Sequence, residues 1–307
     1  MTADRFGPGS SGEFTAVSSV RPTSSDPEFA TEPAADAPSG ASSRTTARGR
    51  SAGSSAIQWR PQFPPQHGAW AFIAVPVLVG MAVAGWSAVG WLYLLALLVA
   101  YPVGYYGGRA LTARIRRGSW TRLARRELGR AVPWAVLLGV LGLPLVVLRP
   151  WLVLVGLGLA ALWLLGLWVA DRFGERSMAN DLVLVAQALV AVPSTVALVA
   201  GLGAVSGGLA AATWTATALV AGYLVGSVIH VKSLLREAGD LRWRRLDIGW
   251  HVLMVVLAAL VDPWWLVGFG PALIRSVVGR PGARPGLIGG IEAIVAVLVV
   301  VAAMLAG

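Results

Sequence analysis

Long apolar runs fill most of the chain after residue 65 and leave it few ways to fold. A helix that crosses the hydrocarbon core of a bilayer, about 30 Å thick, needs roughly 20 mostly apolar residues. Nine runs approach this length, near residues 69–85, 88–108, 131–148, 151–170, 182–201, 211–231, 248–261, 263–276 and 287–306. Only 13% of the residues are charged, against about 25% in soluble domains. The sequence therefore predicts an all-α polytopic transmembrane bundle of about nine spans.

The seventh and eighth runs are short, and two arrangements remain open for them. They could be two crossings joined by a tight turn at residues 262–265, where tryptophans would lie at the interface. They could also form one broken re-entrant hairpin. Proline residues near the middle or start of several runs, Pro76, Pro193 and Pro263, predict discontinuous helices, because proline cannot donate the usual helical hydrogen bond.

The first sixty residues differ from the rest. They are rich in Ser, Thr, Pro, Ala and Gly and have no apolar run that could offset the entropy of ordering. They also lack the basic stretch followed directly by an apolar segment that a signal peptide needs. We expect residues 1–60 to be a disordered tail and residues 61–307 to be a transmembrane helical domain.

The basic residues predict an orientation, because Lys and Arg in short loops stay on the cytoplasmic side. Residues 109–130 hold eight arginines, and the later connectors on the same side hold most of the others, whereas the opposite side holds only Arg149. This asymmetry places the N-terminus in the cytoplasm, in a plasma membrane. It also accounts for the net charge of +10 as a topological signal, so no nucleic-acid partner is expected. The bilayer itself is the expected partner.

Polar side chains that could carry chemistry gather at the cytoplasmic ends of the predicted spans. Ionisable groups within spans are usually paired and functional, so a polar site on this face is expected. Its candidates for binding a small solute or an anionic lipid headgroup are His67, Glu175, Arg176, Asn180, Asp181, His230, Lys232, Arg236 and Glu292. Lys232 and Arg236 are four residues apart and share a helix face suited to an anion.

Purely structural roles for the same residues remain open. Asn180 and Asp181 could cap the fifth helix while Glu175 and Arg176 pair at the interface, and Lys232 could extend its charged end to the interface. His251 is expected to be a hydrogen-bonded interface residue. The chain has no cysteine and no tight metal-binding spacing such as His-Glu-x-x-His, so no metal and no cofactor are predicted.

Four motifs carry a resemblance to a known family. They are Pro64, His67, Gly68, Ala69, Trp70 and Ala71; Glu175, Arg176, Ser177, Asn180 and Asp181; Gly226, Ser227, Val231, Lys232, Ser233 and Arg236; and Pro271, Ala272, Leu273 and Arg275. Over about residues 64–307 the chain resembles the YwiC-like family of bacterial integral membrane proteins. The resemblance implies a helical membrane protein but no particular activity.

Three functional classes remain open. A small-solute transporter or permease fits the proline-broken spans and the polar Gln187, Ser194 and Thr195 inside the fifth. An intramembrane enzyme acting on a lipid or isoprenoid headgroup fits a weaker, topological similarity to UbiA-type prenyltransferases. Those enzymes hold Mg²⁺-diphosphate with Asp-rich motifs after the second and sixth spans, whereas this chain has Tyr105 to Arg109 and Lys232 to Asp240 there. The third class is a non-catalytic binding or assembly protein.

Overall fold

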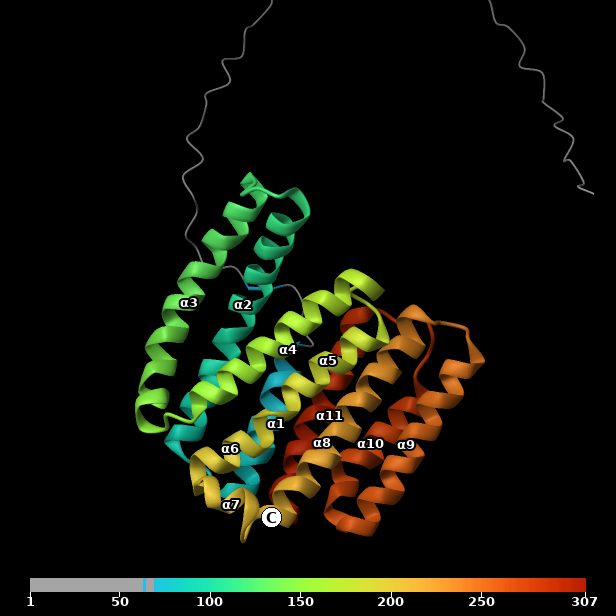
Figure 1. The fold of residues 1–307 in the computed structure, drawn as a ribbon. Helices are drawn as coiled ribbons and strands as arrows, with labels where there is room; N and C mark the ends of the chain where they lie inside the picture. The colour runs from blue at the N-terminus through green and yellow to red at the C-terminus, as the bar shows by residue number, and fades with distance from the viewer. Residues whose placement is uncertain (1–62, 65–68) are drawn as a thin grey trace, which may run out of the picture. The chain divides into compact units, whose positions relative to one another are not determined.

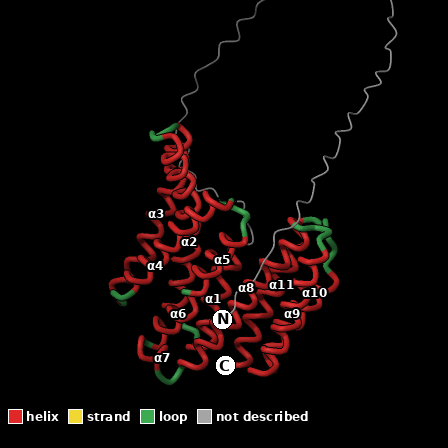
Figure 2. The backbone as a smooth tube through the Cα atoms, turned by 45° about the vertical axis from the view of Figure 1, so that its right-hand side comes forward, coloured by secondary structure: helices red, strands yellow, loops and turns green. Residues whose placement is uncertain are grey.

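The computed structural model describes residues 63–64 and 69–307, and the predicted tail and the candidate His67 lie outside this part of the chain. The described residues form helices joined by short turns and contain no strand (Figure 2). The prediction of an all-helical fold is therefore confirmed for them.

The helices follow one another along the chain as Figure 1 labels them. They are α1 (Ala69–Ala84), α2 (Ala88–Arg117), α3 (Arg122–Leu148), α4 (Leu152–Phe173), α5 (Met178–Leu189), α6 (Ala191–Ala200), α7 (Leu202–Ser206), α8 (Ala210–Val231), the π-helix η1 (Lys232–Arg236), α9 (Leu241–Val261), the 3₁₀-helix η2 (Pro263–Trp265), α10 (Leu266–Val278) and α11 (Pro285–Ala306). Six segments of the described chain are long and apolar enough to cross a membrane: α2, α3, α4, α5 with α6, α8 with η1, and α11.

Two of the three discontinuities predicted from proline are present in the structure, and the third is not. α5 ends at Leu189 and α6 begins at Ala191 because Pro193 has no N–H to donate to the carbonyl four residues earlier. Pro263 likewise begins η2, which Asp262 caps through the Trp264 N–H at 2.9 Å. The discontinuity predicted at Pro76 is wrong, since α1 runs unbroken through it. A single proline removes one helical hydrogen bond, and neighbouring helices can hold the rest of the helix in place.

The core is centred on α1, which contacts α2, α5, α6, α8 and α11. Val75 and Val79 of α1 are buried in one cluster with Val220 of α8 and Val299 of α11. In contrast, α3 and α4 expose rows of apolar side chains, among them Leu143 and Leu154. Surface of this kind is stable against lipid tails, so the exposed side chains fit association of the bundle with a bilayer.

The arginine-rich connectors gather at one end of the bundle, as Figure 1 shows. Arg116 at the end of α2 pairs with Asp171 near the end of α4 at 2.8 Å. The Gly282 N–H, between α10 and α11, donates to the Leu234 carbonyl of η1 at 3.1 Å. The antiparallel helices thus bring the same-side connectors of the sequence analysis together in space.

Candidate functional site

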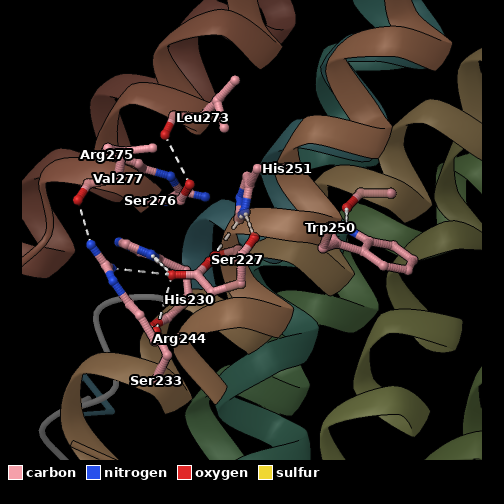
Figure 3. A network of polar contacts seen from close by, with 12 residues as sticks. Ser227, His230, Ser233, Arg244, Trp250, His251, Leu273, Arg275, Ser276 and Val277 are labelled. Atoms are coloured by element: carbon pink, nitrogen blue, oxygen red, sulfur yellow. Dashed lines mark hydrogen bonds and ion pairs between the residues drawn. The ribbon is translucent and has the colours of Figure 1, made fainter. Parts of the chain in front are cut away.

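Eight side chains from five neighbouring helical segments form what we call the buried polar network. Figure 3 shows several of them converging between the helices. The members are Ser227 and His230 of α8, Ser233 of η1, Arg244, Asp247 and His251 of α9, Arg275 of α10 and Glu292 of α11. It lies near the end of the bundle that holds the arginine-rich connectors.

Asp247 is the centre of the network and is completely buried. Its Oδ2 lies 2.9 Å from His230 Nδ1 and accepts a hydrogen bond from Ser233 Oγ at 3.0 Å. Its Oδ1 lies 3.1 Å from His251 Nδ1, and that nitrogen is also 2.8 Å from the backbone carbonyl of Asp247. A buried carboxylate needs such partners because an isolated charge is strongly disfavoured away from water. Asp247 therefore fixes the positions of two imidazole rings.

Glu292 and Arg275 form the second ionic centre. Glu292 Oε1 makes an ion pair with Arg275 Nη1, and Oε2 accepts a hydrogen bond from Ser227 Oγ at 2.6 Å. His230 Nε2 lies 4.0 Å from Glu292 Oε1, so His230 connects the two carboxylates. The network therefore extends continuously from α9 through α8 to α11 and α10.

The formal charges of the network balance. Arg244 Nη1 lies 3.7 Å from Asp247 Oδ2, and Arg244 Nη2 donates to the Val277 carbonyl. Two arginines thus face two carboxylates, and the sum is zero when both histidines are neutral. Such compensation is what allows charged groups to persist inside a membrane protein.

Helical spacing and one close helix contact account for this assembly. Arg244, Asp247 and His251 follow at intervals of three and four residues and so share one face of α9. Gly226 lets α8 approach that face, because a Cβ there would lie 3.1 Å from His251 Nε2 and 3.0 Å from Trp250 Cδ1. Trp250 Nε1 donates to the Gly222 carbonyl at 2.9 Å, one helical turn before Gly226, and this bond also joins α9 to α8.

A second group, which we call the clasp, ties the α4–α5 turn to η1. Lys232 Nζ lies 3.0 Å from Asp181 Oδ2 and donates to the Arg176 carbonyl at 2.6 Å. Arg236 Nη1 contacts the same two acceptors at 3.3 and 3.0 Å. The predicted anion face of Lys232 and Arg236 is therefore occupied by the chain's own carboxylate. The alternative in which Lys232 extends its charged end to the interface does not hold either, since its side chain is buried.

The alternative in which Asn180 and Asp181 cap the fifth helix does not hold. Ser177 is the N-cap of α5 and accepts from the Asn180 N–H at 3.2 Å. Asn180 Nδ2 instead donates to the Glu175 carbonyl at 3.0 Å and closes the turn before the helix. The helix starts earlier than predicted, so Asp181 lies in its first turn and is free to contact η1. The Glu175 and Arg176 residues are exposed, and only their carbonyls enter these contacts.

The structure thus divides the predicted candidates between two groups. His230 and Glu292 belong to the buried polar network, whereas Asp181, Lys232, Arg236 and the Arg176 carbonyl form the clasp. Sequence reasoning missed Asp247 and Arg275 as site residues. Asp247 could have been identified from its spacing, because it lies four residues before His251 and so shares a helix face with it. Arg275 could have been identified because Glu292, a carboxylate inside a predicted span, needs a cation as its partner.

We also searched the described residues for side chains that could bind a metal ion. Among them, no three His, Asp or Glu side chains are placed to hold a metal ion.

Between α2 and α3, the buried Glu127 pairs with Arg130 at 2.8 Å and with Arg109 at 3.5 Å. Arg130 also lies over the ring of Tyr106. Glu127 is a second buried, arginine-paired carboxylate, remote from the network in sequence.

Comparison with known proteins gives a similarity to one family and no function. A family model described as "YwiC-like protein" matches residues 63–196, which include the first two motifs of the sequence analysis. The uncharacterised protein YwiC of Bacillus subtilis (strain 168) is 29% identical over 221 residues, which are 69% of this chain and 84% of that protein. No solved structure matches the chain. The two sequence matches agree with the motif resemblance: the chain is similar to the YwiC-like family model over residues 63–196 and to the Bacillus subtilis protein over 221 residues.

Proposed function

We propose that the protein is a multi-pass membrane transporter for a small solute, with the buried polar network as its central site. One observation carries this proposal: ionisable side chains of three helices, α9, α8 and α11, form a continuous series of contacts from Asp247 through His230 to Glu292. Chains of His and carboxylate groups inside membrane bundles mark ion and substrate pathways. A purely structural core would be expected to use apolar residues, because well-packed apolar side chains are often at least as stable as a buried ion pair.

The broken helix α5–α6 supports the same function. Interruptions of spanning helices supply free backbone groups for solute and ion binding in many transporters. Beside the break, Ser194 Oγ lies 2.9 Å from Tyr93 Oη, and Thr195 donates to the Ala191 carbonyl at 2.6 Å. Ser194 Oγ also donates to the Val190 carbonyl at 2.7 Å, so both hydroxyls place polar atoms beside the break, in an otherwise apolar part of the core.

The proposed topology has nine crossings, with the N-terminus in the cytoplasm of a plasma membrane. All nine apolar runs of the sequence fall within helices of the structure, the fifth as α5 with α6 and the eighth as η2 with α10. The arginine-rich connectors share one end of the bundle, and Lys and Arg are retained on the cytoplasmic side. In this arrangement the network and the clasp face the cytoplasm.

Flux through vesicles tests the transporter. Purified protein is reconstituted into liposomes on a solid-supported membrane, and currents are recorded on exchange to a panel of sugars, amino acids, amines, carboxylates and phosphate. We expect a solute-dependent signal from wild type that Asp247→Asn abolishes. The matched control is Asp171→Asn, which neutralises an exposed carboxylate paired with Arg116 and should leave the signal unchanged.

The outcome separates the three functional classes. The transporter proposal would be rejected if no compound of the panel gave a signal, or if a well-folded Asp247→Asn protein were fully active. The enzyme class predicts instead a chemical change in lipids of the same vesicles, which mass spectrometry of the extracted lipids detects. A binding or assembly role predicts neither flux nor lipid conversion.

A further inference from the structure

Arg275 has more hydrogen-bonding capacity than the surrounding protein uses. Its side chain is 4% exposed, and its guanidinium carries five N–H donors. Nη1 is ion-paired with Glu292, but Nε and Nη2 donate to none of the described residues. A buried donor of a charged group that lacks an acceptor destabilises the protein, because the group has lost its hydrogen bonds to water. The described residues therefore supply only part of the hydrogen bonding that Arg275 can make.

The unused donors have a defined shape. Nε–H and Nη2–H lie along one edge of the planar guanidinium and match the two oxygens of a carboxylate or phosphate. Other donors in the network also lack a complete set of partners. Arg244 Nη1 is buried and forms no hydrogen bond with the described residues. Two guanidinium groups of the network therefore have N–H donors without a hydrogen-bond acceptor among the described residues.

Glu292 shows that the guanidinium accepts a carboxylate. It reaches Arg275 from α11, and it also has alternative partners on α8. Ser227 Oγ donates to its Oε2 at 2.6 Å, and His230 Nε2 lies 4.0 Å from its Oε1. With 13% of its side chain exposed, Glu292 is the less buried of the two network carboxylates. It can therefore leave Arg275 and keep polar contacts with α8.

We propose that Arg275 binds an oxoanion, a carboxylate or a phosphate group, and that Glu292 occupies the guanidinium in the unliganded protein and is displaced by the ligand. This inference rests on the proposed function and names its class of solute. Glu292 then acts as an intramolecular competitor, which sets how much ligand is needed to occupy Arg275.

Ligand-dependent thermal stability measures this binding without a membrane gradient. The protein in dodecyl maltoside is heated while its tryptophan fluorescence is followed, at constant ionic strength, with sodium acetate, sodium phosphate or dioctanoyl phosphatidic acid as probes. A ligand that binds only the folded protein raises Tm with its concentration. The first two probes represent free solutes and the third represents a lipid headgroup, so the comparison identifies the source of the oxoanion.

One variant is expected to bind the probes more tightly than wild type, and another is expected not to bind them. We expect Glu292→Gln to lower the half-saturating probe concentration about tenfold or more, because the tethered competitor is gone. The double variant Arg275→Met with Glu292→Gln removes both charges together and should fold but show no rise in Tm. Glu127→Gln is the matched control, since it neutralises another buried carboxylate paired with an arginine, and its half-saturation should equal that of wild type.

Four results would overturn the proposal. They are no Tm rise with any probe in wild type and Glu292→Gln, equal half-saturation of these two proteins, a Tm rise that persists in the double variant, or an equal gain in Glu127→Gln. The transporter is judged separately. If the protein binds an oxoanion as expected but shows no vesicle flux, the Arg275 site is supported and the transporter proposal is rejected. If it shows flux but no oxoanion binding, the transporter proposal is supported and the Arg275 site is rejected.

Discussion

The clasp between Asp181 and Lys232 offers a direct test of how burial changes the strength of an ion pair in this protein. Lys232 Nζ and Asp181 Oδ2 are 3.0 Å apart, with side-chain exposures of 6% and 14%. The pair between Arg116 and Asp171 has a similar separation, 2.8 Å, with exposures of 66% and 61%. The two pairs therefore differ mainly in their access to solvent.

The expected energies follow from this difference. Two unit charges 3.0 Å apart attract by about 5.5 kcal/mol at an effective dielectric constant of about 20. Desolvation offsets part of this attraction, and Arg236 shares the same carboxylate. We therefore expect a coupling energy of about 2 kcal/mol for the clasp, within the range measured for residues of one ionic network. Exposed pairs contribute about 0.2–1 kcal/mol, so the Arg116 pair should lie below about 1 kcal/mol.

Two double-mutant cycles measure these energies. The clasp cycle uses Lys232→Met, which keeps the packing of the aliphatic stem, with Asp181→Asn. The exposed cycle uses Arg116→Met with Asp171→Asn. Unfolding free energies come from tryptophan fluorescence during titration of dodecyl maltoside micelles with sodium dodecyl sulfate. Coupling energies that agree within about 0.5 kcal/mol for the two pairs would refute the burial argument.

Two further predictions concern packing and topology. Gly268→Ala should destabilise the protein by about 1–3 kcal/mol in the same titration, because its Cβ would lie 2.8 Å from the Val299 Cα, whereas Gly249→Ala, with nothing within 4 Å, should cost nothing. Single cysteines can be placed in this cysteine-free chain at the exposed Ser119 and Ser206. A membrane-impermeant maleimide added to intact cells should label position 206, with position 119 labelled only after lysis; the reverse pattern would invert the topology.

The helices were predictable from sequence because their signal is local. Each apolar run carries its own length and hydrophobicity, and each falls within helices of the structure. The break before Pro193 was predictable for the same reason, since proline acts on its own helix. The start of α5 was less certain, because Ser177, Asn180 and Asp181 are all residue types that cap helices. Only the position of the turn decides which of them does so.

The site was less predictable because its contacts join distant parts of the chain. Asp181 meets Lys232 across 51 positions, a pairing that depends on how α5 packs beside α8 and not on any local pattern. Arg275 was not recognised as a site residue because its position beside a connector was already explained by the retention of basic residues on one side of the membrane. In the structure its side chain turns inward to Glu292.

The balance of charge decides which experiments on the network can be interpreted. Two arginines and two carboxylates lie together where few groups are exposed, so neutralising one of them leaves an uncompensated partner. A loss of function after a single change such as Arg275→Met or Asp247→Asn can therefore be interpreted only together with a separate measurement of folding. Removing Arg275 and Glu292 together keeps the network neutral, and neutralising Glu292 alone frees a cation for a ligand to occupy. Gain of binding in the second variant and loss in the first cannot both arise from misfolding, and for this reason the paired design tests the site itself.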